Sequence, residues 1–195
     1  MKAPEPVVLS GFGVRLEPID ESHRDGIRAA TDADRSAFSV SGPGSMAGGA
    51  DAWTDQALAE RAAGGRLPFT VLEGDTVAGG SSFLEMALAD DRLEIGHTWY
   101  GGPWQGTRVN PAAKMLLLTY AFDDLGAQRV TLKCDARNDR SRRAILKLGA
   151  QFEGILHSWG RRMEQPELLR DAAIYAILVA DWPEVRAGLE ERLSP

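Results

Sequence analysis

The order of hydrophobic and polar positions predicts alternating strands and helices from the start of the chain. Residues 13–18 alternate apolar and charged side chains, which indicates a strand, and Asp20 can cap a helix that continues to about Thr31. A glycine-rich loop over 39–50 then precedes a second helix over 51–63. The first third of the chain is therefore expected to contain a strand, a helix, a loop and a helix.

Three strand-like runs follow, over 67–74, 76–88 and 92–100. Glu73-Gly74-Asp75 has the composition of a tight turn, so the first two runs are close enough to form a hairpin. We expect an antiparallel meander of three strands.

Together with the run over 92–100, the second half of the chain predicts a strand-helix-strand-helix segment, then two strands and a last helix. Gly126 and Gly149 are expected to end two of these helices. The expected elements are a helix from Pro111 to about Leu125, a strand over 129–136, a helix over 138–149, strands over 151–161 and 168–179, and a helix over 181–193. This mixture places the chain in the α+β class, with α/β mixing.

Composition narrows the class of protein without identifying an activity. The 195 residues, 44% hydrophobic and 26% charged, are enough for one core, so we expect a single domain over 1–195. No run approaches the ~18 apolar residues of a membrane span, and the N-terminus lacks a secretory apolar region. One cysteine cannot form an internal disulfide, which favours a cytoplasmic location. A net charge of −6 argues against nucleic acid as a partner.

The helix expected from Pro111 begins with an unfavourable charge pattern. Asn110 is a good N-cap and Pro111 suits the first helical position, yet Arg108 precedes them and Lys114 lies close behind. Cations near a helix N-terminus are unfavourable, and a bound anion would reverse that effect. The glycines at 101, 102 and 106 would also let backbone N–H groups approach a phosphate closely.

The helix expected over 138–149 repeats this pattern, because Asn138 is a plausible N-cap and three arginines follow it. Several phosphates on one ligand would suit both helix starts. The alternative is that these are solvated surface charges that Asp135 and Asp139 neutralise. The three arginines are Arg140, Arg142 and Arg143.

Three stretches together resemble the GNAT superfamily of acyl-CoA-dependent N-acyltransferases, in its RimJ/RimL-like branch. They are LEIGHTW (93–99), WQGTRVN (104–110) and RNDRSRRAILKLGAQFEG (137–154). The third is similar to the branch pattern N-x-x-S-x-x-x-x-x-K-x-G-x-x-x-E-G. The resemblance implies a GNAT fold, with a mostly antiparallel, centrally split mixed sheet of about seven strands flanked by helices. It also implies acetyl-CoA as co-substrate, with no metal.

The resemblance assigns a set of CoA-binding residues, although one loop departs from the family pattern. The superfamily's pyrophosphate loop reads Q/R-x-x-G-x-G/A, but Arg108 and Asn110 stand here where small residues are usual. We therefore expect pyrophosphate contacts to depend more on the side chains of Arg108 and Lys114. The expected CoA-binding residues are Trp99, Tyr100, Gln105, Gly106, Thr107, Arg108, Val109, Asn110, Lys114, Asn138 and Arg142.

The chemistry requires a proton acceptor, because a lysine amine with a pKa of about 10.4 is mostly protonated at neutral pH. Glu94 is the candidate, directly or through a water, since the resemblance places its strand beside the acetyl group. The alternative is a surface carboxylate. Strict alternation puts His97 on the opposite face from Glu94 unless a bulge intervenes, and we interpret His97 as a packed residue.

A departing thiolate also needs a proton, for which a hydroxyl is suitable. Ser141 and Tyr175 are the candidates; Ser141 could instead satisfy only a backbone N–H, and Tyr175 could be only a packed aromatic. Cys134 shares a strand face with apolar residues and is interpreted as packing rather than as a nucleophile. Direct transfer in a ternary complex is therefore favoured.

The sequence does not identify the amine acceptor. Ribosomal protein N-termini, other peptides, aminoglycosides, polyamines and amino acids all remain open, and acceptor contacts are expected from the N-terminal helices, from 42–49 and from 160–168. Arg161 and Arg162 would suit an acidic acceptor. A catalytically weak CoA-binding sensor or interaction module remains the alternative function. Either a monomer or a homodimer is compatible with the sequence, and no membrane partner is expected.

Overall fold

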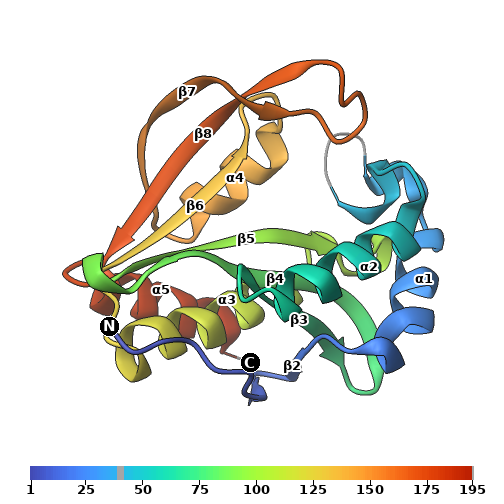
Figure 1. The fold of residues 1–195 in the computed structure, drawn as a ribbon. Helices are drawn as coiled ribbons and strands as arrows, with labels where there is room; N and C mark the ends of the chain where they lie inside the picture. Colours follow the sequence, from blue (N-terminus) through green and yellow to red (C-terminus); the bar gives the residue numbers. More distant parts are fainter. Residues whose placement is uncertain (39–41, 195) are drawn as a thin grey trace.

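A single eight-stranded sheet organises the part of the chain that the structure describes, residues 1–38 and 42–194 of a computed structural model (Figure 1). Its strand order is β1-β2-β3-β4-β5-β6-β8-β7. The strands are β1 (Leu9–Gly11), β2 (Val14–Pro18), β3 (Arg66–Glu73), β4 (Thr76–Ala87), β5 (Arg92–Tyr100), β6 (Arg129–Asp135), β7 (Gln151–Arg161) and β8 (Leu169–Leu178). The sequence predicted seven of these eight strands.

The additional strand, β1, depends on a tight turn. Phe12 and Gly13 join β1 to β2 with φ angles of 53° and 81°. Two consecutive positive φ angles are typical of a type I′ hairpin turn, which fits the right-handed twist of its strands. β1 was not predicted because three residues are too few to show an alternating pattern.

The sheet divides between β5 and β6, which form its one parallel pair in the described chain. They are paired only from Arg92 opposite Arg129 to Glu94 opposite Thr131. Beyond these residues the two strands separate, and β6, β7 and β8 rise away from β2–β5 (Figure 1). The prediction of a mostly antiparallel mixed sheet with a central split is confirmed.

Helices cover both faces of β2–β5. The helices are α1 (Arg24–Asp32), α2 (Gly49–Ala62), α3 (Val109–Thr119), α4 (Asp139–Lys147) and α5 (Trp182–Leu193). The larger core joins α3 and α5 to one face of the sheet through fully buried residues such as Phe83 and Leu117. A smaller core joins α1 and α2 to the other face around Trp53 and Trp99. In Figure 1, α4 lies beside β6 in the upper half, away from the helices that cover β2–β5.

The region between α1 and α2 is only partly described. The expected loop over 39–50 includes residues 39–41, which lie outside the described chain. The remainder contains a short 3-10 helix, Pro43–Ser45, and α2 begins at Gly49, two residues earlier than expected.

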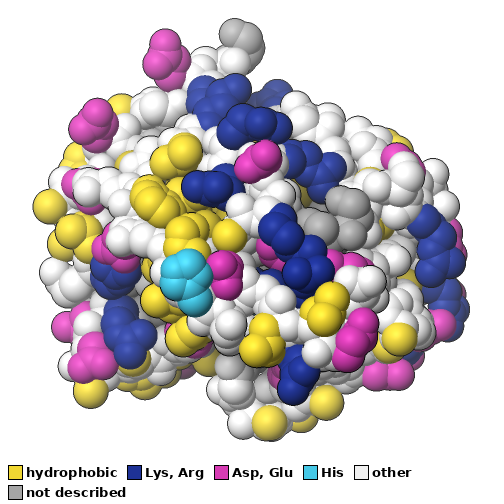
Figure 2. All heavy atoms as spheres, turned by 90° about the horizontal axis from the view of Figure 1, so that it is seen from above, with side chains coloured by type: hydrophobic (Ala, Val, Ile, Leu, Met, Phe, Trp, Pro, Cys, Tyr) yellow, Lys and Arg dark blue, Asp and Glu magenta, His cyan; other side chains and the backbone are white. Residues whose placement is uncertain are grey.

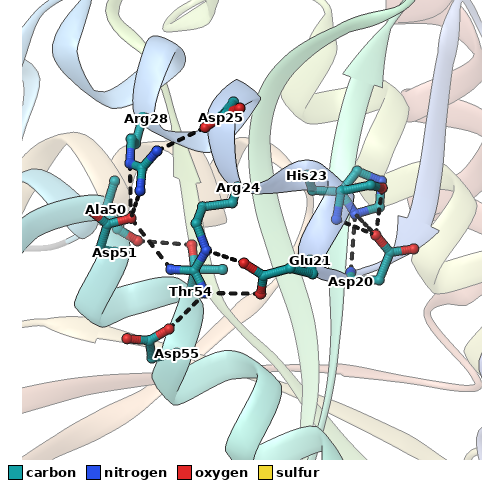
Figure 3. A network of polar contacts seen from close by, with 11 residues as sticks. Asp20, Glu21, His23, Arg24, Asp25, Arg28, Ala50, Asp51, Thr54 and Asp55 are labelled. Atoms are coloured by element: carbon teal, nitrogen blue, oxygen red, sulfur yellow. Dashed lines mark hydrogen bonds and ion pairs between the residues drawn. The ribbon is translucent and has the colours of Figure 1, made fainter.

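Ion pairs fix α1 against α2 (Figure 3). The Arg24 guanidinium lies 2.5 Å from Glu21, 3.3 Å from Asp51 and 2.7 Å from Asp55. Arg28 also reaches Asp51, at 2.8 Å. Individual pairs between exposed groups contribute little to stability, but several that share partners restrict how the two helices can move.

Three local predictions of helix ends are confirmed. Asp20 accepts a hydrogen bond from the backbone N–H of Ser22 at 2.8 Å and caps the turn that leads into α1. Asn138 caps α4, and Gly149 ends it with a φ of 97°. Within the described ranges, no helix combines the length and the apolar character needed to cross a membrane.

Candidate functional site

A cleft of about 790 Å³ opens where β5 and β6 separate. Its walls come from β4, β5, β6, the loop after β5, residues 42–47, α2, α3, the start of α4 and the β7–β8 hairpin. Nine of the residues predicted for the site line it: Glu94, Trp99, Tyr100, Gln105, Gly106, Asn110, Lys114, Asn138 and Ser141. A cavity of about 520 Å³ beside α1 contains none of them, so the split in the sheet is the candidate site.

A bulge in β5 decides which side chains enter the cleft. The register against β4 shifts between Gly80 and Ser82, and His97 has a φ of 48°. Before the bulge Ile95 packs into the core on the α3 side, whereas after it Thr98 is the residue that bonds Lys114 of α3. The extra residue therefore places Glu94 and His97 on the same face.

The interpretation of His97 as a packed residue is wrong. Its side chain is exposed within the cleft rather than covered by the core. The walls of the cleft lower the pKa of His97, and the positive charge of Arg66 lowers it further. A neutral imidazole therefore faces the cleft at pH 7, on the same side as Glu94.

Glu94 lies at the apex of the cleft and is the last residue of β5 that pairs with β6. The residue is 5% exposed, and its Oε2 lies 2.8 Å from the Lys133 ammonium. Lys133 also contacts Glu85 at 2.5 Å. Burial raises the pKa of Glu94, and Lys133 opposes the rise. A buried carboxylate with a raised pKa is suited to accept a proton near neutral pH.

Gly96 makes room for this carboxylate. A Cβ at Gly96 would lie 2.7 Å from Glu94 Oε1, closer than a side chain tolerates without displacement. The glycine of LEIGHTW thus lets the carboxylate lie close to the β5 backbone, and a Cβ there would displace the ends of the Glu94 and Leu84 side chains.

The loop after β5 is joined to α4 at the other end of the cleft. Gln105 Nε2 donates to the backbone oxygen of Tyr100 at 3.0 Å, and Gly106 turns the chain with a φ of 76°. Arg140 of α4 donates to Gln105 Oε1 and to the backbone oxygen of Ala37, the latter at 3.0 Å. An exposed guanidinium thus crosses this end of the cleft.

The start of α3 differs from the prediction. The helix begins at Val109, and Thr107 Oγ1 accepts from the Val109 backbone N–H at 3.3 Å, so Asn110 is not the N-cap. Arg108 instead donates to the backbone oxygen of Leu193 at 3.2 Å. The side chains of Thr107, Arg108 and Val109 therefore do not line the cleft. Asn110 does, and its Oδ1 is buried without a hydrogen-bond partner in the described chain.

The start of α4 separates Ser141 from Arg142. Asn138 Oδ1 accepts from the Ser141 backbone N–H at 3.0 Å, and the Ser141 side chain lines the cleft. Arg142 turns away and donates to the Tyr175 hydroxyl at 3.2 Å. The structure therefore does not bring Arg142 to the site. Tyr175 is 0% exposed and lies outside the cleft, which leaves Ser141 as the hydroxyl in position.

Cys134 has a mixed position. It packs against the larger core, as predicted, but it is only partly buried and also lines the cleft. Burial raises the pKa of its thiol, although the Ser141 hydroxyl opposes the rise. A protonated thiol is a poor nucleophile, so the geometry does not favour an acyl-cysteine.

Lys114 is buried in the floor of the cleft rather than exposed at the start of a helix. It is 4% exposed, and its Nζ donates to Thr98 Oγ1 at 2.6 Å and to Ser81 Oγ at 3.1 Å. Burial lowers the pKa of Lys114 to about 7. The expected contact of this lysine with a pyrophosphate does not fit its position beneath β5.

This burial makes stability depend on pH. Lys114 has a pKa of about 7 when folded and 10.5 as its ordinary value, so between these limits the unfolded chain binds more protons. Folding stability should rise with pH over that window, by up to about 1.4 kcal/mol per pH unit. In urea unfolding at pH 7, 8 and 9, the free energy of unfolding of wild type should increase at each step relative to that of Lys114→Met. A constant difference between the two proteins would contradict the buried position.

Several cleft residues were missed in the sequence. Arg140 is one of the three arginines that follow Asn138, and helical position alone does not separate it from Arg142. Lys133 and Trp159 lie on strands with no local motif, and the Lys133 ammonium lies 5.2 Å from the centre of the Trp159 ring. Arg170 also lines the cleft, and no sequence signal indicated it.

Comparisons with known proteins agree with this architecture. The profile of the acetyltransferase (GNAT) domain family matches residues 14–151. A comparison with curated proteins found no significant match. Among solved structures, a T. thermophilus protein provisionally assigned as an acetyltransferase is 34% identical, with a TM-score of 0.85, over 98% of this chain and 99% of its own.

Two further solved structures extend the likeness. A GCN5-related N-acetyltransferase from Brucella melitensis is 27% identical, with a TM-score of 0.85, over 99% of this chain and 88% of its own. Mycobacterium smegmatis RimJ, solved in complex with CoA-disulfide, is 20% identical, with a TM-score of 0.79, over 98% of this chain and 97% of its own. At that identity the last likeness concerns the fold alone.

Proposed function

Because the chain belongs to the acetyltransferase (GNAT) domain family, and is thus an acetyl-CoA-dependent N-acetyltransferase, we propose that it acetylates a primary amine by direct transfer in a ternary complex. The acceptor is a protein or peptide N-terminus or a small-molecule amine, as in the RimJ/RimL-like branch. The observation that carries this proposal is the buried carboxylate of Glu94 at the point where β5 and β6 separate.

The cleft residues fit acetyl-CoA. Beyond Glu94 the edge of β5 that faces β6 has no strand partner, so its backbone groups are available to the amide-rich arm of the co-substrate. Asn110 Oδ1 is a buried acceptor without a partner, and the backbone at Gly106 is open to a close approach. Arg140 supplies positive charge for phosphates at this end. RimJ, which shares this fold, was solved in complex with CoA-disulfide, and this supports a CoA ligand for the fold.

Glu94 is assigned as the proton acceptor. The thioester supplies the acetyl carbonyl and a thiolate leaving group. Glu94 takes the proton that the amine loses as the nitrogen–carbon bond forms, directly or through a water, because its raised pKa matches this task. Lys133 holds the carboxylate in place and stabilises its charged form.

Ser141 is assigned as the proton donor to the sulfur. Its backbone is fixed by Asn138, and its hydroxyl faces the cleft, whereas the alternative donor, Tyr175, is bonded by Arg142 elsewhere. As the carbon–sulfur bond breaks, Ser141 gives its proton to the thiolate and recovers one from solvent. The raised pKa of the Cys134 thiol supports transfer without an acyl-cysteine.

Release of free CoA thiol from acetyl-CoA in the presence of a panel of primary amines tests the function. At least one amine should accelerate thiol release, and mass spectrometry should find that amine acetylated. Stabilisation by CoA without turnover on any amine would support a binding module instead.

The assigned position of the phosphates has its own test. Arg140→Gln should raise the KM for acetyl-CoA about tenfold, because a charge-assisted contact is lost. Arg143→Gln on the same helix is the matched control, since Arg143 is exposed and does not line the cleft. An equal KM in both variants would show that the phosphates are bound elsewhere.

A further inference from the structure

The cleft carries an excess of positive charge that co-substrate binding at the Arg140 end does not explain. Among the described residues, six basic and three acidic side chains line it, in a chain whose net charge is −6. Each acidic side chain already has a cation: Glu85 and Glu94 contact Lys133, and Asp135 contacts Arg137. Apart from Lys114 and Arg140, the remaining cations come from the β7–β8 hairpin.

Figure 2 looks onto the face that carries this hairpin. Lys and Arg side chains form a band across its middle, beside a group of hydrophobic side chains. The surface at the hairpin is thus both cationic and apolar, which suits a ligand that carries a negative charge.

The three hairpin arginines are not equivalent. Arg161 Nη1 donates to the backbone oxygens of Pro166 and Glu167, both at 3.2 Å, and Arg162 Nε donates to the backbone oxygen of Leu169 at 3.2 Å. Each of these two arginines therefore uses part of its guanidinium for hydrogen bonds within the hairpin. The prediction that both would suit an acidic acceptor applies better to a third arginine, which the sequence did not indicate.

The side chain of that third arginine, Arg170, has no hydrogen bond or ion pair with any residue in the described ranges. Its Nη1 is buried and unpaired, and its Nη2 would lie 4.0 Å from a Cβ at Gly160, the residue opposite it on β7. The carboxylates of Asp135 and Glu164 both contact Arg137 instead. A partly buried guanidinium without a partner is unfavourable unless a ligand supplies the acceptor.

Arg170 lines the same cleft as Glu94 and His97. Burial raises the pKa of Glu94. The Lys133 contact lowers this pKa, and so does the positive charge of Arg170. The walls of the cleft also lower the pKa of His97, and the positive charges of Arg66 and Arg170 add to that effect. The guanidinium of Arg170 therefore acts on the same space as the proton acceptor.

We propose that Arg170 binds a carboxylate or another anionic group of the acceptor, so that the substrate is a primary amine with an acidic group near the amine. This inference rests on the proposed function. Arg170 fixes the anion through paired N–H donors, while Glu94 receives the amine at the apex of the cleft. A free α-amino acid and a peptide with an acidic residue next to its N-terminus share this chemistry.

Two matched pairs of acceptors distinguish these sources. One pair is L-alanine and L-alaninamide, and the other is two hexapeptides that differ only by Glu or Gln at the second position. Wild type should prefer the acidic member of at least one pair by about tenfold or more in kcat/KM, as expected for a charge-assisted contact. Arg170→Gln should reduce that preference to about one, and Arg170→Lys should retain part of it. Arg143→Gln is the control and should keep the preference.

Failure of this inference can be separated from failure of the proposed function. If wild type acetylates both members of each pair equally, or if Arg170→Gln keeps the preference, the role of Arg170 is overturned while the activity stands. If no amine is acetylated, calorimetry of the same compounds with CoA-saturated protein still tests it. Tighter binding of an acidic member, lost in Arg170→Gln, supports the anion site, and equal or absent binding overturns it. A thermal unfolding midpoint for each variant confirms that it is folded.

Discussion

Replacing Glu94 with glutamine should lower kcat by about 10²- to 10⁴-fold at pH 7, which corresponds to roughly 3 to 5 kcal/mol of barrier. The amide keeps the shape of the side chain but cannot accept the proton of the amine. The loss should shrink as pH rises toward the pKa of the acceptor, because unprotonated amine then becomes available without help. Steady-state rates from pH 6 to 9 measure both effects.

Glu85→Gln is the matched control for this substitution. Both carboxylates contact Lys133, but Glu85 is more exposed and forms no part of the proposed proton path. In wild type, activity should also fall as pH drops through the raised pKa of Glu94, because the protonated carboxyl cannot serve as a base. Unchanged kcat/KM in Glu94→Gln from pH 6 to 9 would mean that Glu94 is not the proton acceptor, and a water chain or His97 would be the next candidate.

Features set by neighbours in sequence were predictable. Strand-like runs and the turn residues between them identified every strand longer than three residues, and the Asn138 cap and the Gly149 stop need only the residues within one turn of them. The cap at Asn110 failed because a competing side chain, Thr107, accepts the bond at the helix start. Two cap candidates three residues apart look equally good in a sequence when backbone geometry decides between them.

Features that depend on how the elements pack in three dimensions were not predictable. Alternation places His97 opposite Glu94, and only the bulge against β4 brings both to one face. Lys114 resembles a helix-start cation, but it is the sixth residue of α3, and its direction beneath β5 follows from packing. Arg140 and Arg142 are both close to Asn138, yet a helix turns residues two positions apart in different directions. Arg170 could be recognised only by its lack of partners in three dimensions.

Gly79→Ala should cost about 3 kcal/mol of stability, a large effect for adding one methyl group. A Cβ at Gly79 would lie 2.1 Å from the backbone oxygen of Trp99 and 2.6 Å from Tyr100 Cδ1. Because the closest obstacle is backbone, no side-chain rotation relieves the clash. β4 must move away from the end of β5, where the cleft and its loop begin.

The matched control is Gly188→Ala on the exposed face of α5, where a Cβ would meet nothing within 4 Å. That change should stabilise the protein by roughly 0.5 to 1 kcal/mol, because alanine is the better helix former. Urea unfolding of both variants gives the two free energies with opposite signs. Gly79→Ala should also raise the KM for acetyl-CoA, since a shifted Trp99 displaces the loop that Gln105 anchors to Tyr100. Stability within about 0.5 kcal/mol of wild type would mean that β4 and β5 are less tightly apposed than described.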